Sequence, residues 1–429
     1  MTDVAAAQSE TGSRALLAGG TLLALAMFAA NGGNYLLNVV LGRWLTPPEF
    51  ADANLMVTLM LLVTAVAVSL QLIAARFAGI NQVTGDNNDT IAMARGLERW
   101  ALVAGIALAV LLAGGATVWR DFFNSASAWP FVILGLGMPA YLVQAVGRGV
   151  LQGELRFRDL SRTFMHEMLV RVVLGIGLVA LGFGVTGATV ALSVSFVATW
   201  LSVRTALHWD SAAGGRGKVE RKVLSYAGPV GVLLLGQIII NNGDVLISKR
   251  GLDPNEAGVY AAIALVGRAV FFLSWSVATT LFPAAAQRNE AGEESHSLLH
   301  AGLAAVAALG VGAVVGARLL GGTVLGRVFG EAYGGVSNQL AYYALATAVF
   351  AMANLMVSHY LALGQLREAF IMLAGALVQT VLLLAARNTI DDLIRAQVIA
   401  MFILFLAVSS SHIHRLVRSA PPLTTGVSV

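Results

Sequence analysis

The heptapeptide "RWLTPPE" at Arg43–Glu49 returns later in the chain as "RGLDPNE" at Arg250–Glu256. Both copies hold arginine, leucine, proline and glutamate in the same order, 207 residues apart (from position 43 to position 250). Other pairs at this offset are Asn34 and Asn241, Gly114–Gly115 and Gly321–Gly322, Arg120 and Arg327, and Phe122 and Phe329. A further echo, "GELR" at Gly153 and "GQLR" at Gly364, is shifted by four more residues. Several matches in register predict an internal duplication of two similar halves.

The composition indicates that most of the chain is dissolved in lipid. Of its 429 residues 57% are hydrophobic and only 12% are charged, and the mean hydropathy is +0.77. A typical soluble domain carries about 25% charged residues, so an aqueous surface of ordinary size cannot be built from this chain. The sequence has no cysteine, which excludes disulfides, thiolate metal sites and thiol nucleophiles.

Apolar segments of about 20 residues, long enough to cross a bilayer, recur along the whole chain. Twelve such segments run near residues 14–41, 53–78, 97–119, 129–150, 164–182, 186–207, 223–248, 257–283, 298–320, 337–362, 367–386 and 391–413. Each half holds six. Because an even number returns the chain to its starting side, the halves are predicted to be parallel repeats, as in many transporters with a midplane substrate site.

The predicted fold class is therefore an all-α integral membrane protein of two six-helix lobes. The predicted parts are a tail at 1–13, an N-lobe at 14–209, a polar linker at 210–222, a C-lobe at 223–413 and a tail at 414–429. Lysine and arginine are concentrated in the loops on the side that holds the N-terminus. The positive-inside rule then predicts that both termini are cytoplasmic.

A polar stripe interrupts the first apolar segment at "NGGNYLLN", Asn31–Asn38. Four side chains share one helical face there, at i, i+3, i+4 and i+7; they are Asn31, Asn34, Tyr35 and Asn38. The equivalent segment of the second half has its own stripe, made of Gln237, Asn241, Asp244 and Ser248. Interhelical hydrogen bonding is one explanation, worth about 0.6 kcal/mol per pair. Two symmetric stripes beside glycines instead favour a water-filled substrate cavity.

Arg268 lies eleven residues past the start of the segment 257–283, about 16 Å deep at roughly 1.5 Å per residue. An arginine there costs at least ~2.5–3.5 kcal/mol on insertion scales, so it must face protein or water. Tyr260 and Trp275 lie about two turns away on the same face. A cation between aromatic rings would suit an anionic group attached to sugars; a structural ion pair with Asp244 is the alternative.

Other arginines in or near the predicted spans have two explanations each. Arg171 can line the cavity or extend to the cytoplasmic face. Arg76 and Arg148, at cytoplasmic span ends, are predicted to fix the topology, with contact to a phosphate as the alternative. Arg43 and Arg250, in the repeated motif, are predicted to lie in helix-terminating turns.

Motifs for enzymes and cofactors are weak or missing. "GFGVTG" at Gly182–Gly187 matches GxGxxG but joins two membrane helices, so it is predicted to be a tight hairpin. The sequence has no Walker A loop and no arguable serine–histidine–acid arrangement. We therefore expect no bound cofactor, no metal site and no enzymatic activity.

The segment Asn241–Gln287 resembles the helix 7–8 signature of bacterial oligosaccharide flippases, members of the multidrug/oligosaccharidyl-lipid/polysaccharide exporter superfamily. That signature has an aspartate in helix 7, a Gly-x-Tyr at the start of helix 8 and a Phe-Pro at its end. Asp244, Gly258–Tyr260 and Phe282–Pro283 match it in turn. The segments 34–56 and 184–191 are similar to the family's helix 1–2 junction and to the start of its helix 6.

The resemblance implies a MATE-like fold in the bacterial inner membrane. It also implies alternating-access transport of a polyprenyl-pyrophosphate-linked oligosaccharide to the outer leaflet. Expected partners are that lipid-linked oligosaccharide, membrane lipids and glycosyltransferases or a polymerase of the same pathway, but no nucleic acid. Arg268 occupies a place where related lipid II flippases carry a functional arginine. A cation-coupled multidrug exporter using Asp244 is the alternative, and a non-transporting scaffold is a third.

Overall fold

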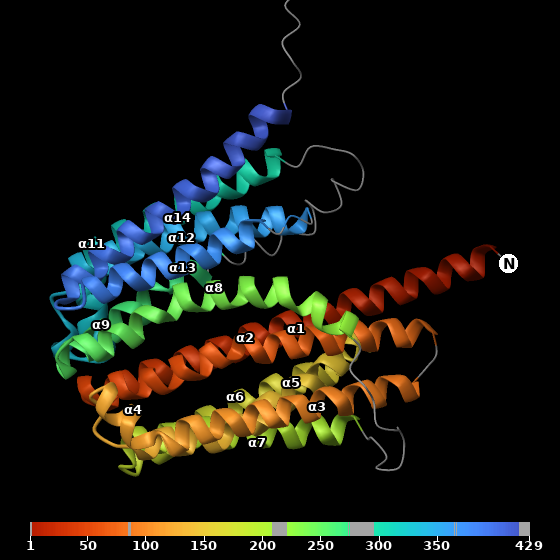
Figure 1. Cartoon of the computed structure of the whole chain (residues 1–429), viewed down its shortest axis with the longest axis horizontal. Coiled ribbons are helices and arrows are strands. Elements are labelled where there is room, and N and C mark those ends of the chain that lie inside the picture. Colours follow the sequence, from red (N-terminus) through yellow and green to blue (C-terminus); the bar gives the residue numbers. More distant parts are fainter. Residues whose placement is uncertain are drawn as a thin grey trace, which may run out of the picture. The chain divides into compact units, whose positions relative to one another are not determined.

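The computed structural model describes residues 2–84, 87–207, 221–272, 274, 296–363, 365 and 367–419. Within these ranges every regular element is helical (Figure 1). The α-helices are α1 (Thr2–Trp44), α2 (Pro47–Thr84), α3 (Asn87–Ala109), α4 (Ala116–Phe122), α5 (Trp129–Gly153), α6 (Phe157–Ala180), α7 (Gly184–Leu207), α8 (Arg221–Gly251), α9 (Pro254–Gly267), α11 (His296–Phe329), α12 (Ser337–Ala362), α13 (Arg367–Ala385) and α14 (Ile390–Ser419). A π-helical turn, η1 (Val110–Gly114), follows α3, and a 3-10 turn, η2 (Glu331–Tyr333), follows α11.

Twelve helical segments within the described ranges are long and apolar enough to cross a membrane, which confirms the predicted fold class. The boundaries differ at several places. The first helix already begins at Thr2, so residues assigned to an N-terminal tail are helical. The described part of the eighth span runs from Pro254 to Phe272, and most of the predicted remainder to residue 283 lies outside the described residues. The predicted lobe boundaries stay predictions, since almost all of the linker at 210–222 is also outside them.

The repeated heptapeptide forms the start of a helix in both halves. In the first copy the Glu49 carboxylate accepts hydrogen bonds from the Thr46 backbone N–H at 2.9 Å and from the Thr46 hydroxyl at 2.8 Å. This is one arm of a capping box, and proline at the first helical position fits the same pattern. In the second copy Asp253 Oδ1 accepts from the Asn255 backbone N–H at 2.9 Å. The motif thus ends one membrane helix and starts the next, as predicted for Arg43 and Arg250.

The glycines of "GFGVTG" form the predicted hairpin between α6 and α7. Gly182 has φ +87° and Gly184 has φ +49°, a left-handed backbone that glycine adopts without a steric penalty. The chain reverses within these few residues and α7 runs back along α6.

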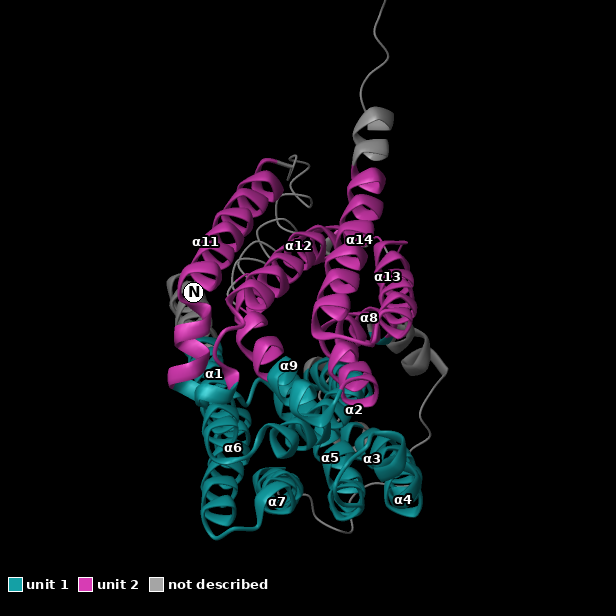
Figure 2. Ribbon diagram, turned by 90° about the vertical axis from the view of Figure 1, so that its left-hand side faces the viewer, with its two compact units in different colours: residues 1–231, 253–261, 328–332 teal, residues 232–252, 262–327, 333–429 magenta. Residues whose placement is uncertain are grey.

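The chain divides into two compact units (Figure 2). Unit 1 comprises residues 1–231, 253–261 and 328–332, and unit 2 comprises residues 232–252, 262–327 and 333–429. Within unit 1, α5 packs against α2, α3 and α7, while α6 packs against α1 and α7. Within unit 2, α14 packs against α12 and α13 over a core that includes Val306, Phe350 and Met401.

Close contact between α2 and α5 shapes the interior of unit 1. A Cβ on Gly149 would lie 2.2 Å from the Gln71 carbonyl oxygen, and one on Gly153 would lie 2.2 Å from the Ala75 carbonyl oxygen. Glycines four residues apart let two membrane helices approach in this way. The Gln71 amide also donates to the Gln152 side chain at 2.9 Å. The last turns of α5 are therefore held tightly on α2.

Candidate functional site

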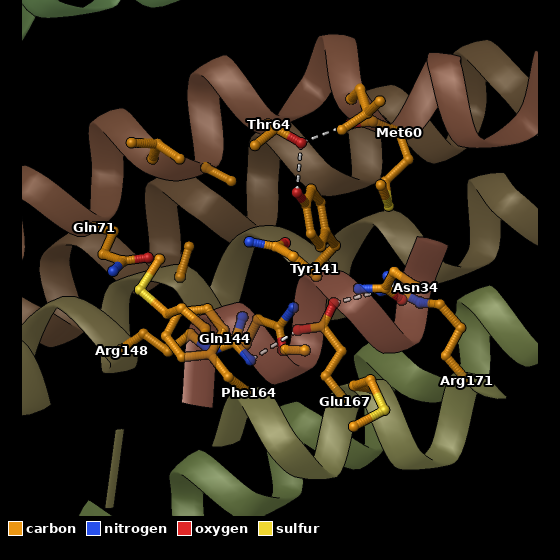
Figure 3. A pocket seen from close by; sticks show the side chains of 18 residues that line it. Asn34, Met60, Thr64, Gln71, Tyr141, Gln144, Arg148, Phe164, Glu167 and Arg171 are labelled. Carbon is orange, nitrogen blue, oxygen red and sulfur yellow. Dashed lines mark hydrogen bonds and ion pairs between the residues drawn. The ribbon is translucent and has the colours of Figure 1, made fainter. Parts of the chain in front are cut away.

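Unit 1 contains a polar cavity of about 240 Å³ between α1, α2, α5 and α6 (Figure 3). Its polar and charged lining residues are Asn31, Asn34, Thr64, Gln71, Tyr141, Gln144, Arg148, Glu167 and Arg171. Methionines, small aliphatic residues and Phe164 complete the wall. A polar cavity within membrane helices marks a route or a binding place for a polar group.

Two arginines in the lining of this cavity share one carboxylate. Arg148 Nη2 lies 2.7 Å from Glu167 Oε2, and Arg171 Nη2 donates to Glu167 Oε1. Arg148 and Arg171 are only 6% and 8% exposed. Glu167 and Arg171 lie one turn apart on α6, where i and i+4 side chains are neighbours. Arg148 belongs to α5. The three side chains together carry a net charge of +1.

The guanidinium of Arg148 is fixed by groups other than Glu167. Its Nε donates to Thr163 Oγ1 at 3.1 Å, and its Nη2 donates to the Thr163 carbonyl oxygen at 3.0 Å. Its Cζ lies 4.1 Å from the centroid of the Phe164 ring, a cation–π contact. Arg148 is thus oriented towards the cavity by one turn of α6.

Arg171 is fixed in the same manner by two further helices. Its Nε donates to Ser195 Oγ on α7 at 3.2 Å, and its Nη1 donates to Asn34 Oδ1 on α1 at 3.1 Å. Asn34 belongs to the polar stripe of residues 31–38, for which the sequence predicted a cavity. One residue of that stripe therefore contacts a charged side chain, that of Arg171. Both arginines are therefore held in place by neutral polar groups as well as by the carboxylate.

The rest of the cavity presents hydroxyl and amide groups. Thr64 and Tyr141 hydroxyls are hydrogen-bonded at 2.7 Å. Gln144, one turn before Arg148 on α5, is 1% exposed, and neither of its amide atoms has a hydrogen-bond partner in the described chain. Buried amides are nearly always hydrogen-bonded. An unpartnered amide that lines a cavity is therefore a group available to a ligand.

Unit 2 has a different charged cluster, around Asp244. Arg268 donates from Nη2 to Asp244 Oδ1 at 2.7 Å, from Nη1 to Asn242 Oδ1 at 3.3 Å and from Nε to Tyr343 Oη at 3.2 Å. The Tyr343 hydroxyl donates to Asp244 Oδ2 at 2.7 Å. Asp244 is fully buried. The geometry is that of a balanced ion pair, which was the alternative explanation for Arg268.

The predicted site residues fall into several places. Asn31, Asn34 and Arg171 line the cavity of unit 1. Tyr35 and Asn38 are half-buried on the same helix without lining it, and the Asn38 amide donates to the Asn34 carbonyl oxygen at 2.9 Å. A role in binding stays a prediction for all of them.

The predicted residues of the second half that the structure describes form hydrogen bonds with nearby groups or are buried. The Gln237 amide donates to Asn354 Oδ1 at 2.6 Å, and the Asn241 amide donates to the Gln237 carbonyl oxygen at 3.0 Å. Tyr260 is completely buried. Trp275 lies outside the described residues.

Sequence reasoning missed Glu167, Tyr141 and Gln144, and assigned Arg148 chiefly to topology. Glu167 could have been found, because it is the one acidic residue in the predicted segment 164–182. An ionisable residue inside a membrane span is a functional-site hypothesis by default. No cluster of histidine, cysteine, aspartate or glutamate suited to a metal ion occurs among the described residues.

The family of the chain follows from its sequence. A family model described as "Polysaccharide biosynthesis protein" matches residues 40–338, which is well over half of the chain. The chain belongs to this polysaccharide biosynthesis protein family. The match confirms the resemblance drawn from the segment 241–287. No curated protein matches the sequence of the chain.

Solved structures share its fold across nearly the whole chain. A multidrug resistance MATE family transporter of the MOP superfamily, in an inward-facing conformation, aligns with a TM-score of 0.73 at 14% identity, covering 90% of this chain and 96% of that one. The lipid II flippase MurJ aligns with a TM-score of 0.73 at 12% identity, covering 91% and 87%. A MOP superfamily transporter from Pyrococcus furiosus, described as having a binding pocket of reverse polarity, aligns at 0.57 and 16% identity, covering 92% and 95%. The chain is thus a multi-pass membrane protein with the MATE-like fold.

Proposed function

We propose that this protein translocates a polyprenyl-diphosphate-linked oligosaccharide from the inner to the outer leaflet of a bacterial cytoplasmic membrane. Membership of a polysaccharide biosynthesis family and a fold shared with a lipid II flippase support a lipid-linked glycan as substrate. The two halves would alternate access to the two sides of the membrane, with both termini in the cytoplasm. The protein would act beside glycosyltransferases or a polymerase of the same pathway.

The observation that carries the proposal is the pair of buried arginines in the cavity of unit 1. Arginine recognises phosphate oxygens by charge-assisted, often bidentate, hydrogen bonds. Two guanidinium groups on one carboxylate leave the site with excess positive charge, which suits a diphosphate better than a neutral or cationic ligand. Around them the Gln144 amide and the Tyr141 and Thr64 hydroxyls supply hydrogen bonds of the kind that sugar hydroxyls accept and donate. The prenyl tail needs no site, because it can remain in the lipid.

The multidrug exporter remains the second candidate, since MATE transporters share the fold. It requires a membrane carboxylate that is free to take up a cation. Asp244 was the residue predicted for that role, and both of its oxygens accept hydrogen bonds from Arg268 and Tyr343. A carboxylate engaged in this way favours the flippase over the exporter.

The test is complementation of a deletion strain, with polyprenyl-linked oligosaccharide quantified on the cytoplasmic side of the membrane. We expect the deletion to accumulate this lipid, the wild-type gene to clear it, and Arg148→Gln and Arg171→Gln to fail. Arg162→Gln is the matched control, because Arg162 lies on α6 with its side chain 72% exposed and pairs only at the surface with Asp159. Normal surface glycan and no accumulation in the deletion strain would reject the flippase and lead to dye-efflux measurements with Asp244→Asn.

A further inference from the structure

We propose that Glu167 is a built-in counter-ion which occupies the position of a substrate phosphate in the empty cavity and which the incoming diphosphate displaces. The inference rests on the proposed function and concerns how the same cavity changes between its empty and loaded states. It gives Glu167 the role of a competitor of the substrate. As a competitor, Glu167 would lower the affinity for the diphosphate. A carboxylate whose role was to position the arginines would instead raise that affinity.

The geometry of Glu167 is that of a bridging anion. Its two oxygens reach two guanidinium groups from two helices, Arg148 on α5 and Arg171 on α6. A phosphate group likewise presents several oxygens to more than one guanidinium. Carboxylate and phosphate therefore compete for the same N–H donors, and only one of them can hold both arginines at a time.

The arginines do not depend on Glu167 for their positions. Arg148 has the Thr163 hydroxyl and carbonyl oxygen and the face of the Phe164 ring. Arg171 has Ser195 and Asn34. When the carboxylate leaves, these neutral partners keep each guanidinium turned towards the cavity, so the arginines remain arranged for a new anion.

Gln144 gives an independent sign that a ligand belongs here. Its amide lines the cavity, is 1% exposed and has no hydrogen-bond partner for either atom within the described chain. A buried polar group left without partners is costly, and this one lies a single turn from Arg148 on α5 (Figure 3). A ligand that bonds the arginines would have the Gln144 N–H donors and carbonyl oxygen beside it.

The charges of the cavity explain why displacement is required. The other titratable or charged lining residues are Tyr141, Arg148 and Arg171, while the lining residues from α1 and α2 carry no ionisable group. With Glu167 in place the arginines have one positive charge left for a diphosphate. With Glu167 displaced they offer two, and the repulsion between carboxylate and phosphate is relieved. Substrate affinity is therefore reduced by the fraction of time that Glu167 occupies the arginines.

The experiment measures binding of farnesyl diphosphate to the purified full-length protein in detergent. If the carboxylate holds the arginines about nine-tenths of the time, Glu167→Gln should bind this probe roughly tenfold more tightly than the wild type. Glu167→Asp, which keeps the charge on a shorter side chain, should give a smaller gain. Glu98→Gln is the control, since it removes a carboxylate from α3 of the same unit that does not line the cavity; its affinity should equal that of the wild type.

The outcomes separate the inference from the proposed function. Unchanged or weaker binding by a well-folded Glu167→Gln protein, with the wild type binding normally, would overturn the displacement and make Glu167 a positioning residue. If Glu167→Gln did not elute as a folded protein, Glu167→Asp would decide alone, and affinity equal to or below that of the wild type would overturn the inference. Absence of binding by wild type and variants alike would instead count against the proposed function. Inorganic pyrophosphate serves as a second probe: competition by it would show that phosphate chemistry alone is recognised, and its failure would show that the prenyl chain contributes.

Discussion

The two units treat their intramembrane charges in opposite ways. In unit 1 two arginines share one carboxylate beside a cavity, so a positive charge is left over. In unit 2 Arg268 and Asp244 balance each other, and the Tyr343 hydroxyl donates to the second carboxylate oxygen. A balanced and fully hydrogen-bonded pair holds helices together, whereas an unbalanced group is prepared for an anion. Among the described residues, the two halves of the predicted repeat therefore partner their intramembrane charges differently.

The equivalent asparagines illustrate this divergence. Asn34 in α1 and Asn241 in α8 occupy the same position of the repeat. The side-chain amide oxygen of Asn34, Oδ1, accepts a hydrogen bond from Arg171 across helices. The Asn241 amide donates to a carbonyl oxygen of its own helix, one turn back. In the first half the stripe thus lines a cavity, whereas in the second half its residues bond to their own helix and to groups on neighbouring helices.

The largest expected effect breaks the balanced pair of unit 2. Asp244→Ala leaves the Arg268 guanidinium, whose side chain is only 14% exposed, without its carboxylate, which should lower the free energy of unfolding by about 3–5 kcal/mol. Thermal unfolding of the purified protein in detergent measures this loss. In the double variant with Arg268→Ala we expect much of the stability to return, because no uncompensated charge remains. If the stability lost in the double variant equalled the sum of the losses in the two single variants, the two side chains would not be coupled. The contrast between a balanced pair in unit 2 and an unbalanced group in unit 1 would then no longer hold.

The next largest effect concerns diphosphate binding by the two arginines and one carboxylate of unit 1. Arg171→Gln should weaken farnesyl diphosphate binding by about 1.5–3 kcal/mol, the usual worth of a hydrogen bond to a charged group, or roughly 10- to 100-fold. Titration of the purified variant measures the change. The Asp244→Ala, Arg268→Ala double variant is the comparison, and its affinity should stay within a few-fold of the wild type. Equal losses in both would place the anion site in both units.

These contrasts show how far sequence reasoning reached. The spans were predictable because a membrane helix satisfies its backbone internally and must be about 20 apolar residues long, so length and hydropathy suffice. Asn34 and Arg171 were both predicted as cavity residues, and the structure joins them at 3.1 Å. The predicted depth of Arg268 in the membrane also marked it as a residue that needs a partner. Depth alone did not show whether that partner is a ligand or Asp244.

The pairing of Arg148 with Glu167 was beyond the sequence for a physical reason. These residues lie on different helices, and their contact depends on where α5 meets α6 and on how closely α5 approaches α2 at Gly149 and Gly153. Periodicity reports which side chains share a face of one helix, not which face meets which. Burial of Arg148 at the end of its span follows from that tertiary packing, so its position along the chain indicated only topology.

A smaller effect on binding is expected from Gln144, which lines the cavity. Gln144→Met keeps a similar side-chain volume and removes an amide that has no partner in the described chain. Since the unbonded amide is itself a cost to folding, the variant should be as stable as the wild type or more so. Diphosphate binding alone should stay near normal, while a glycosylated lipid diphosphate should bind several-fold less tightly. A variant that lost stability would show that Gln144 is part of the packing and not a group kept for a ligand.

The smallest effect concerns a feature present in both halves, a carboxylate that caps the helix in the repeated heptapeptide, supplied by Glu49 in the first copy and by Asp253, the equivalent of Thr46, in the second. Glu49→Ala removes the carboxylate that caps α2, and Asp253→Ala removes the one that caps α9. Loss of such a cap costs about 0.5–2 kcal/mol, so both variants should unfold at slightly lower temperature by similar amounts. Diphosphate affinity should change in neither, because both side chains lie at helix starts outside the cavity lining. A cost confined to one copy would mean that the duplicated junctions have diverged as the polar stripes have. Equal losses of stability in the two variants would show that both halves keep a cap of similar strength at this helix start. The charged residues between the helices would then be the part of the repeat that has diverged.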